Sequence, residues 1–410
     1  MYQHRTTLGA GIATALTTFA LAACGDSYSA PPASTKADLS KYVAIGTSVS
    51  MGWQSDGVYS ASQQQAWVKR LGAAAGTANF TIPAIASPGC QPPLMSPLGS
   101  FKRIDGTSVG TPSTVCAPNE AGVSLPTNDL AVENATAVEG LNATPETATH
   151  GRGPLTSRVL PPGKTQVTAM RALQPTFVSV EFGGNEVLPA QVGVLAPNGT
   201  YTPVATFEAA YTKIIDSVKA TVPRALLVTL PKDIRQFPTI RTGTEIAAQR
   251  TAFAAFNVTV NANCDASANF VFVRGKVLTA IATGAGRAQA GLGPYDLSCA
   301  DAPGTVDYIL TPTDVAFIND QLLAPMNVII EKKASDNKYA VSSLEALYAT
   351  SKDGVAFNLQ AFLGSATPYG PKISLDGVHP SAEGQRILAN DAIRAINDRY
   401  GNAIASIAAP

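Results

Sequence analysis

Residues 42–48, with the sequence YVAIGTS, decide the fold that we expect for this chain. Four mainly apolar residues form a short run that ends at Gly46, which is typical of a strand buried inside a parallel sheet. The residues after the run are small, so the strand should end in a tight turn that presents Ser48. Further apolar runs that predict strands lie at 176–182, 225–230 and 270–273.

Segments with helical spacing lie between and after these runs. The last of them begins with Pro380 and Ser381, and a serine in that place is a suitable N-cap. Strands that alternate with helices predict an α/β fold whose central parallel sheet is covered by helices on both faces. The earlier predicted helices are 63–75, 165–173, 207–220, 245–262, 313–332 and 342–351.

Two long segments interrupt this alternation. Residues 87–164 are rich in Pro, Gly, Thr and Ser, and they contain one short apolar run, 130–132, that we interpret as a further strand. Residues 275–304 are rich in Gly and Ala. We interpret both segments as long surface loops, and because such loops are commonly functional we expect them to shape the substrate site.

The overall composition excludes some classes of protein. Of 410 residues, 45% are hydrophobic and 14% are charged, a balance that favours a well-filled core over a disordered chain. The formal net charge is +0 and no long basic run occurs, so we expect no nucleic-acid partner.

The N-terminus has the pattern of a bacterial export signal. His4 and Arg5 precede an apolar stretch that ends at Ala23 and is too short for a comfortable membrane span. Its end, LAAC, resembles a lipoprotein cleavage box and predicts lipidation of Cys24; an ordinary secretion signal is the alternative. A lipid on Cys24 would anchor the protein to a membrane of the bacterial cell envelope, on the periplasmic face or the outer surface of the outer membrane. The predicted organisation is a signal peptide at 1–23, a flexible tether at 24–40, one domain at 41–400 and a tail at 401–410.

Four cysteines remain beyond the signal. An even number in an exported protein suggests two disulfides, and four cysteines allow about three pairings. Nearness in sequence favours Cys90–Cys116 and Cys264–Cys299. Metal binding is the alternative, but no pair has close ligand spacing and no histidine lies nearby.

A second stretch, residues 375–381 (LDGVHPS), offers a carboxylate and an imidazole before the last helix. Serine is a weak nucleophile until a base takes its proton, and that base needs a partner to hold its tautomer. We therefore predict that Ser48, His379 and Asp376 form a catalytic triad. Each residue alone would more often serve as a cap or turn residue, so their joint occurrence carries the prediction.

Histidine is the scarcest ingredient of such a site. The chain has three, of which His4 lies in the predicted signal and His150 in a Gly-containing loop where we expect it to be solvated. His379 is left as the base. In parallel sheets, sites form at the carboxyl ends of strands, and Ser48 and Asn185 both follow such predicted ends.

Four short blocks occur in order along the chain: AIGTS at 44–48, LAVENA at 130–135, GGNE at 183–186 and DGVHPS at 376–381. They resemble the conserved blocks of the SGNH (GDSL-type) hydrolases, whose second block is normally LAVPGA and whose third is Gly-x-Asn-Asp. The resemblance extends over about 42 to 398, and the last block is its most specific part.

This resemblance implies a three-layer α/β/α, flavodoxin-like fold and the hydrolysis of carboxylic esters, and we expect no cofactor and no metal. It implies that Ser48 attacks the acyl carbon, that His379 takes and returns the proton, and that Asp376 orients the imidazole. The oxyanion would be held by the amide of Ser48, the side-chain amide of Asn185 and a backbone amide of the second block, for which we favour Asn134.

Three residues depart from the family pattern. Thr47 stands where the family has a supporting aspartate, Asn134 stands where a glycine amide is expected, and Glu186 replaces an aspartate. Asparagine tolerates left-handed geometry, so Asn134 can still offer its N–H, although Gly89 is a rival donor. A literal GDS at 25–27 lies in the predicted tether without a strand before it, so we do not assign it a role.

The expected protein is therefore a serine esterase that acts on carboxylic esters, either acyl lipids or small acyl esters. An O-acetylated polysaccharide is the alternative substrate. A surface lipoprotein that keeps the fold but only binds glycan or lipid is the alternative to an enzyme, and Thr47 and Asn134 motivate it. An esterase would need neutral His379, so we expect its rate to rise with pH through a pKa of about 6 to 7.

Overall fold

A computed structural model of the protein describes residues 36–77, 79–109, 115–148 and 153–409. The predicted signal peptide, Cys24 and His150 lie outside these residues. Within the described part, no helix combines the length and the apolar character that crossing a membrane requires.

The centre of the fold is a parallel sheet of four strands in the order β1-β2-β3-β9. The first three strands were predicted, and every residue in them is buried. The fourth was missed because its sequence, AVSS, alternates between buried and half-buried residues, as an edge strand does. The strands are β1 (Tyr42–Ile45), β2 (Phe177–Val180), β3 (Ala225–Thr229) and β9 (Ala340–Ser343).

The segment around Asp129 runs alongside β1. Asp129 forms a parallel bridge with Ala44, the amide of Leu130 donates to the carbonyl of Ala44 at 2.9 Å, and the amide of Val132 donates to that of Gly46 at 3.1 Å. The strand predicted at 130–132 is thus reduced to this short pairing. In chain order the sheet reads 2-1-3-4-5, a doubly wound order whose ligand site lies where the strand order reverses, at the carboxyl ends of β1 and β2.

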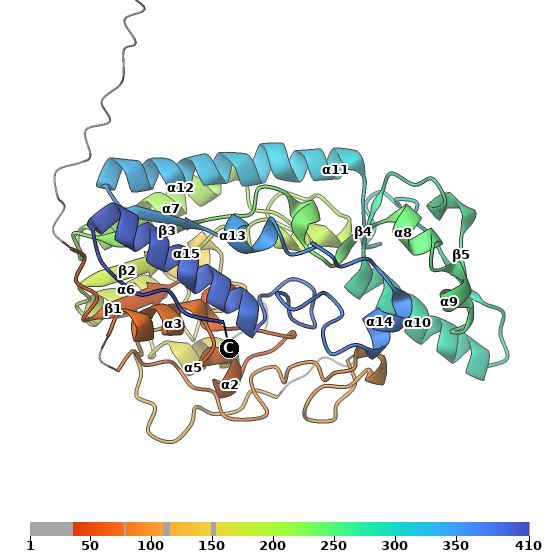
Figure 1. Ribbon diagram of the computed structural model, residues 1–410, viewed down its shortest axis with the longest axis horizontal. Helices are drawn as coiled ribbons and strands as arrows, with labels where there is room; N and C mark the ends of the chain where they lie inside the picture. Colours follow the sequence, from red (N-terminus) through yellow and green to blue (C-terminus); the bar gives the residue numbers. More distant parts are fainter. Residues whose placement is uncertain (1–35, 78, 110–114, 149–152, 410) are drawn as a thin grey trace, which may run out of the picture. The chain divides into compact units, whose positions relative to one another are not determined.

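Two separate cores cover the two faces of the sheet, which confirms the predicted layers (Figure 1). Val43 and Ile45 of β1 belong to one core, with α6, α7 and α12, whereas Tyr42 and Ala44 belong to the other, with α3 and α15. Successive strand residues point to opposite faces, so a strand buried on both sides must be apolar throughout. The covering helices are α3 (Trp67–Ala74), α6 (Gln166–Ala172), α7 (Val204–Lys219), α12 (Ala324–Asn337) and α15 (Ala382–Tyr400).

The last helix, α15, begins as predicted. The hydroxyl of Ser381 accepts hydrogen bonds from the amides of Glu383 and Gly384, so it caps the helix. The helix predicted at 313–332 is also present, but it consists of α11 (Pro312–Ala316), a π-helical segment η5 (Phe317–Leu323) and α12. Such π-helical segments often occur at functional sites.

Residues 240–310 form an insertion whose structure differs from the prediction. The strand expected at 270–273 is β6 (Phe270–Phe272), which pairs antiparallel in a second sheet with β4 (Ile240–Thr242) and β8 (Ile309–Leu310). An apolar run predicts that a strand is buried, but it does not predict which strands pair with it. A two-stranded parallel pair, β5 (Val258–Val260) and β7 (Tyr295–Leu297), completes the insertion.

One helix prediction and one loop prediction in this insertion were wrong. The helix expected at 245–262 is split into α8 (Gly243–Ala247) and α9 (Arg250–Ala254), and the first half of the loop expected at 275–304 belongs to helix α10 (Val273–Gln289). Gly275 and Gly284 lie in α10 because it packs tightly there. A Cβ at either position would come within 2.4 Å of its neighbour, the ring of Tyr308 in one case and a backbone carbonyl in the other.

Both predicted disulfides are present, Cys90–Cys116 in the long loop after α3 and Cys264–Cys299 in the insertion. The long loop itself is mostly irregular. The remaining short elements are α1 (Ser48–Met51), α2 (Ser60–Gln63), η1 (Leu98–Ser100), α4 (Ala137–Asn142), α5 (Gly153–Val159), η2 (Leu188–Val192), η3 (Ile234–Gln236), η4 (Ala262–Cys264), α13 (Glu345–Tyr348) and α14 (Leu359–Gly364).

The ends of the described chain pack onto the fold. The side chains of Asn390 and Asn397 in α15 hold the backbone of Ile407 and Ile404. The side chain of Asn402 forms two hydrogen bonds with the backbone of Ala37. All described residues belong to one compact unit.

Three buried carboxyl groups near β1 and β2 should make stability depend on pH. Burial raises the pKa of Asp129 to about 8, of Glu186 to about 7 and of Glu181 to about 6. Since these folded-state values exceed the ordinary ones, the folded state holds more protons than the unfolded state between about pH 4 and 8, and stability falls as pH rises. We expect the thermal midpoint, measured by calorimetry, to fall between pH 5 and 8.5.

The variant Asp129→Asn should show a weaker fall, because its neutral amide removes the cost of ionising that group. The matched control is Asp216→Asn at an exposed position of α7, which should keep the slope of the wild type. A midpoint that rises over this pH range would contradict the prediction.

Candidate active site

Ser48 is placed by a tight turn at the end of β1. It is the first residue of the one-turn helix α1, and only 4% of its surface is exposed. Gly46 is required just before it, because a Cβ there would lie 2.8 Å from the carbonyl oxygen of Glu181. The turn closes at Gly52, whose left-handed conformation (φ 81°) suits a glycine.

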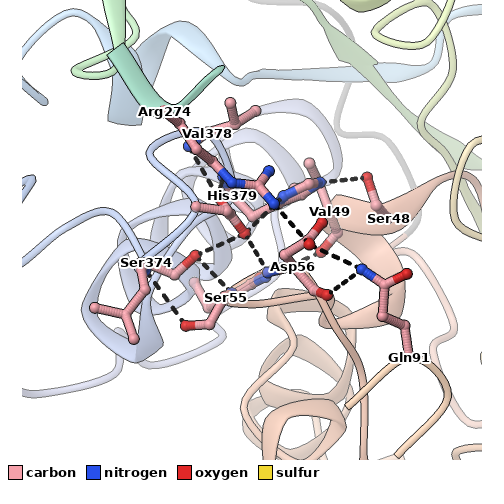
Figure 2. A network of polar contacts seen from close by, with 12 residues as sticks. Ser48, Val49, Ser55, Asp56, Gln91, Arg274, Ser374, Val378 and His379 are labelled. Carbon is pink, nitrogen blue, oxygen red and sulfur yellow. Dashed lines mark hydrogen bonds and ion pairs between the residues drawn. The ribbon is translucent and has the colours of Figure 1, made fainter. Parts of the chain in front are cut away.

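The structure brings Ser48, His379 and Asp376 together. Figure 2 shows the ring of His379 facing the hydroxyl of Ser48. The Nε2 atom of His379 lies 2.9 Å from the hydroxyl oxygen of Ser48, although 331 positions separate the two residues. The Nδ1 atom of His379 lies 3.1 Å from Oδ2 of Asp376. This is the order of contacts that a nucleophile, a base and an orienting carboxylate require.

Asp376 is surrounded by hydrogen-bond donors. Its Oδ1 accepts from the backbone amides of Val378 and His379 at 2.9 and 2.8 Å, and its Oδ2 accepts from the amide of Asp56 at 2.8 Å and the hydroxyl of Ser374 at 3.1 Å. Burial alone would raise the pKa of Asp376, but His379, through its charge and hydrogen bond, and the charge of Arg274 hold that pKa well below its usual range. The group is therefore a fixed anion.

That anion acts on His379. Burial lowers the pKa of the imidazole, but the charge and hydrogen bond of Asp376 outweigh this effect, and Glu133 and Asp56 add to them. The result is a pKa raised above the ordinary 6.5. The site thus favours the protonated form of His379.

A second set of charged residues holds Asp56, whose backbone amide donates to Asp376. The carboxylate of Asp56 forms ion pairs with Arg103 at 2.7 Å and with Arg274 at 2.6 Å, and it accepts a hydrogen bond from Gln91 at 2.8 Å (Figure 2). Arg103 and Gln91 come from the long loop after α3, whereas Arg274 lies in the first turn of α10 in the insertion. The long loop and the insertion at 240–310 therefore meet at Asp56, beside Asp376. Sequence reasoning missed these residues, which have no motif or shared spacing.

The predicted oxyanion donors lie beside one another. The side-chain amide of Asn185 donates to the carbonyl of Ala135 at 3.0 Å, which fixes its orientation and joins the third block to the second. Asn134 has φ 61°, the left-handed conformation that a glycine would take, as expected for its place in the block. The amide of the rival donor, Gly89, donates to the carbonyl of Ala86 at 2.9 Å and is therefore already used.

Glu186 also joins these blocks. It is fully buried after β2, and its Oε1 accepts from the amide of Ala137 at 2.6 Å. The longer side chain that replaces the family's aspartate thus contacts the first residue of α4.

Comparison with protein families gives a match to the GDSL-like lipase/acylhydrolase family over residues 42–392. The chain belongs to this family. It is accordingly a carboxylic ester hydrolase. A comparison with curated protein sequences found no match.

Solved structures with a similar fold share little sequence with this hydrolase. A mutant of an acetyl-xylooligosaccharide esterase from Geobacillus Stearmophilus has 12% identity and a TM-score of 0.36, over 89% of this chain and 96% of that one. The extracellular lipase from Streptomyces rimosus has 13% identity and a TM-score of 0.34, over 87% of this chain and 98% of that one. Scores this low carry no argument about substrate.

The hydrolase has a mainly apolar cavity at Ser48 and His379, with an empty volume of about 550 Å³ that includes open solvent. Asn185 also lines it, so the reacting groups stand at one wall. Its apolar walls come from the loops after β2 and β3, from the π-helical segment and from the start of α13. They include Val187, Leu188, Leu230, Ile234, Leu323 and Leu344.

On the far side of Asn185 the surface is different. A groove there contains Asn134 and Asn185 together with polar residues of the segment 198–202. The two donors thus stand between an apolar cavity and a groove whose lining is partly polar and partly apolar. Among the residues that the structure describes, no group of three or more His, Cys, Asp or Glu side chains is arranged to hold a metal ion.

The raised pKa of His379 predicts the pH dependence of hydrolysis. Because the base must be neutral, kcat/KM should rise with pH through a limb above about 6.5. In Asp376→Asn the limb should move to lower pH, because burial alone then acts on the imidazole, and kcat/KM should fall by roughly 10³-fold as its tautomer is no longer held.

These effects are measured as kcat/KM for a soluble ester between pH 5 and 9. Asp353→Asn, at an exposed position, is the control and should keep the profile of the wild type. A wild-type limb well below pH 6 that does not move in Asp376→Asn would contradict this account of the base.

Proposed function

We propose that this hydrolase is a serine esterase that uses Ser48 as nucleophile, His379 as general base and acid, and Asp376 as the orienting anion. The observation that carries the proposal is the continuous chain of contacts from Asp376 Oδ2 through the imidazole to the hydroxyl of Ser48, at 3.1 and 2.9 Å. A protein that only bound ligands would have no need of this arrangement.

The reaction follows from these contacts. Ser48 attacks the acyl carbon while its proton passes to Nε2 of His379, and Asp376 stabilises the imidazolium through Nδ1. The negative charge that develops on the ester oxygen is held by the amides of Ser48 and Asn134 and by the side chain of Asn185. His379 then gives its proton to the leaving alcohol. Water, activated by the same base, releases the acid and restores Ser48.

The cavity supports an acyl group with an aliphatic chain. Its walls are mainly apolar where they meet Ser48, and an acetyl group would leave most of them without contact. The groove beside Asn134 and Asn185, which has a mixed polar and apolar lining, would face the alcohol part of the ester. An O-acetylated polysaccharide, the second candidate, is supported only by that groove. Attachment to the cell envelope through a lipid on Cys24 remains a proposal from sequence.

The role of Ser48 can be tested directly. Ser48→Ala should lower kcat for short p-nitrophenyl esters by at least about 10³-fold, because in the described part of the chain Ser48 is the nucleophile that contacts Nε2 of His379. A fluorophosphonate probe should label the wild type at Ser48 and should not label the variant.

Ser157→Ala, at an exposed position of α5, is the control and should be fully active and labelled. Turnover by Ser48→Ala at the rate of the wild type would refute the proposal.

The acyl preference can be tested by narrowing the cavity. Wild-type kcat/KM should increase from acetyl to octanoyl p-nitrophenyl esters. In Leu344→Trp, the added ring would occupy the cavity, so kcat/KM for the octanoyl ester should fall by about tenfold or more while that for the acetyl ester changes little.

The same substitution at Leu292, which is 55% exposed in the insertion, is the control and should affect neither ester. A wild type that prefers acetyl esters, together with release of acetate from acetylated glycans, would favour the polysaccharide alternative instead.

A further inference from the structure

One buried carboxylate, that of Glu181, holds the turn that presents Ser48. Glu181 follows β2 directly and is 1% exposed. The amide of Thr47 donates to its Oε2 at 3.1 Å, the hydroxyl of Thr47 lies 2.9 Å from both oxygens, and the hydroxyl of Ser50 donates to Oε2 at 3.0 Å. Its partners thus lie on both sides of the nucleophile, at the residue before it and two residues after it.

We propose that Glu181 is the positioning residue of the nucleophile, a carboxylate supplied by the neighbouring strand where the family has an aspartate in place of Thr47. This inference rests on the proposed function, because it takes Ser48 to be the nucleophile. It explains the departure at Thr47. A threonine there binds the carboxylate through both its amide and its hydroxyl, whereas an aspartate would oppose it with a like charge.

The contacts of Glu181 favour an ionised carboxylate over a neutral group of the same shape. An ionised carboxylate only accepts hydrogen bonds, and Glu181 receives them from one amide and two hydroxyls. Charge-assisted bonds of this kind are stronger than neutral ones and hold a short helix such as α1 in one position. A glutamine could place its oxygen where Oε2 lies and keep the bonds from the amide of Thr47 and the hydroxyl of Ser50, but it would make them without the negative charge.

The surroundings of Glu181 make its ionisation sensitive to pH. The titratable groups that act on it or feel its charge are Asp129 beside β1, Glu186 after β2, Tyr211 on α7 and Tyr348 on α13, all of them acids. Burial raises the pKa of Glu181 to about 6, although its bonds to the nucleophile turn lower it. The positioning carboxylate is therefore ionised at neutral pH and becomes protonated in mild acid.

As the pH falls, two groups that the wild-type reaction needs should become protonated, first the imidazole of His379 and then the carboxylate of Glu181. Log(kcat/KM) should fall with a slope steeper than 1 over about one to two pH units below about pH 6, until protonated Glu181 gives the residual rate of the glutamine variant. In Glu181→Gln the slope should be 1, kcat at pH 8 should be about 10- to 100-fold lower, and KM should stay within about threefold of the wild type.

Asp129→Asn is the matched control. It also removes a buried carboxyl group beside this sheet, but Asp129 does not bond to the nucleophile turn and, with a pKa of about 8, is already neutral over the acid limb. Its kcat and its steep acid limb should match those of the wild type.

A double-mutant cycle separates position from packing. Thr47→Asp alone should lower kcat, because it sets a second carboxylate against Glu181. The double variant Thr47→Asp/Glu181→Gln should recover kcat by at least about tenfold over Glu181→Gln, because the single charge returns to the turn. A loss of folding in Glu181→Gln would not be repaired in this way.

Two results would overturn the inference: Glu181→Gln with the kcat and steep acid limb of the wild type, or a double variant no more active than Glu181→Gln. The fluorophosphonate probe keeps this test separate from the proposed function. A wild type that is not labelled at Ser48 defeats the proposed function. If the wild type and Glu181→Gln are labelled at Ser48 at equal rates, only the positioning role fails.

Discussion

The parallel pairing of β1 with β2 is the constraint on which the site depends. Ile45 and Val180 are paired in register, so the two strands end together and the chain leaves both at the same edge of the sheet. The residues that follow supply Ser48 from one strand and Glu181 and Asn185 from the other. An antiparallel neighbour would have carried its last residues to the opposite edge. The site is thus a direct consequence of sheet topology, at the point where the strand order reverses.

The remaining residues of the site, Asp376 and His379, lie near the C-terminal end of the chain. Ionic contacts and hydrogen bonds hold them in place. A buried carboxylate without partners would cost several kcal/mol, yet Asp376 has a donor on every side. One of these donors is the backbone of Asp56, whose side chain is anchored by Arg103 and Arg274. The long loop after α3 and the insertion therefore do more than cover the fold, because Arg103 and Arg274 fix the peptide of Asp56 that donates to Asp376.

The departures from the family pattern are each accommodated by the structure. Thr47 bonds to Glu181, Asn134 takes the backbone conformation of the glycine that it replaces, and Glu186 reaches the amide of Ala137. Glu181 places an anion beside the turn from the neighbouring strand, whereas Asn134 and Glu186 supply the left-handed residue and the link between blocks from the same positions. These substitutions thus fit an esterase at least as well as a protein that has lost catalysis.

The sequence by itself determined the strands β1 to β3, most of the covering helices, both disulfides and the short spacing along the chain that lets Asp376 contact His379. Local apolar spacing and nearness along the chain are enough to predict these features. The sequence did not determine that residues 270–273 join a second sheet, that β9 is the edge strand of the first sheet, or that Asp56 forms an ion pair with Arg274. Only the tertiary structure decided these, because a strand pattern records burial without naming its partner. An isolated charge likewise acquires its role only from the residues that folding brings beside it.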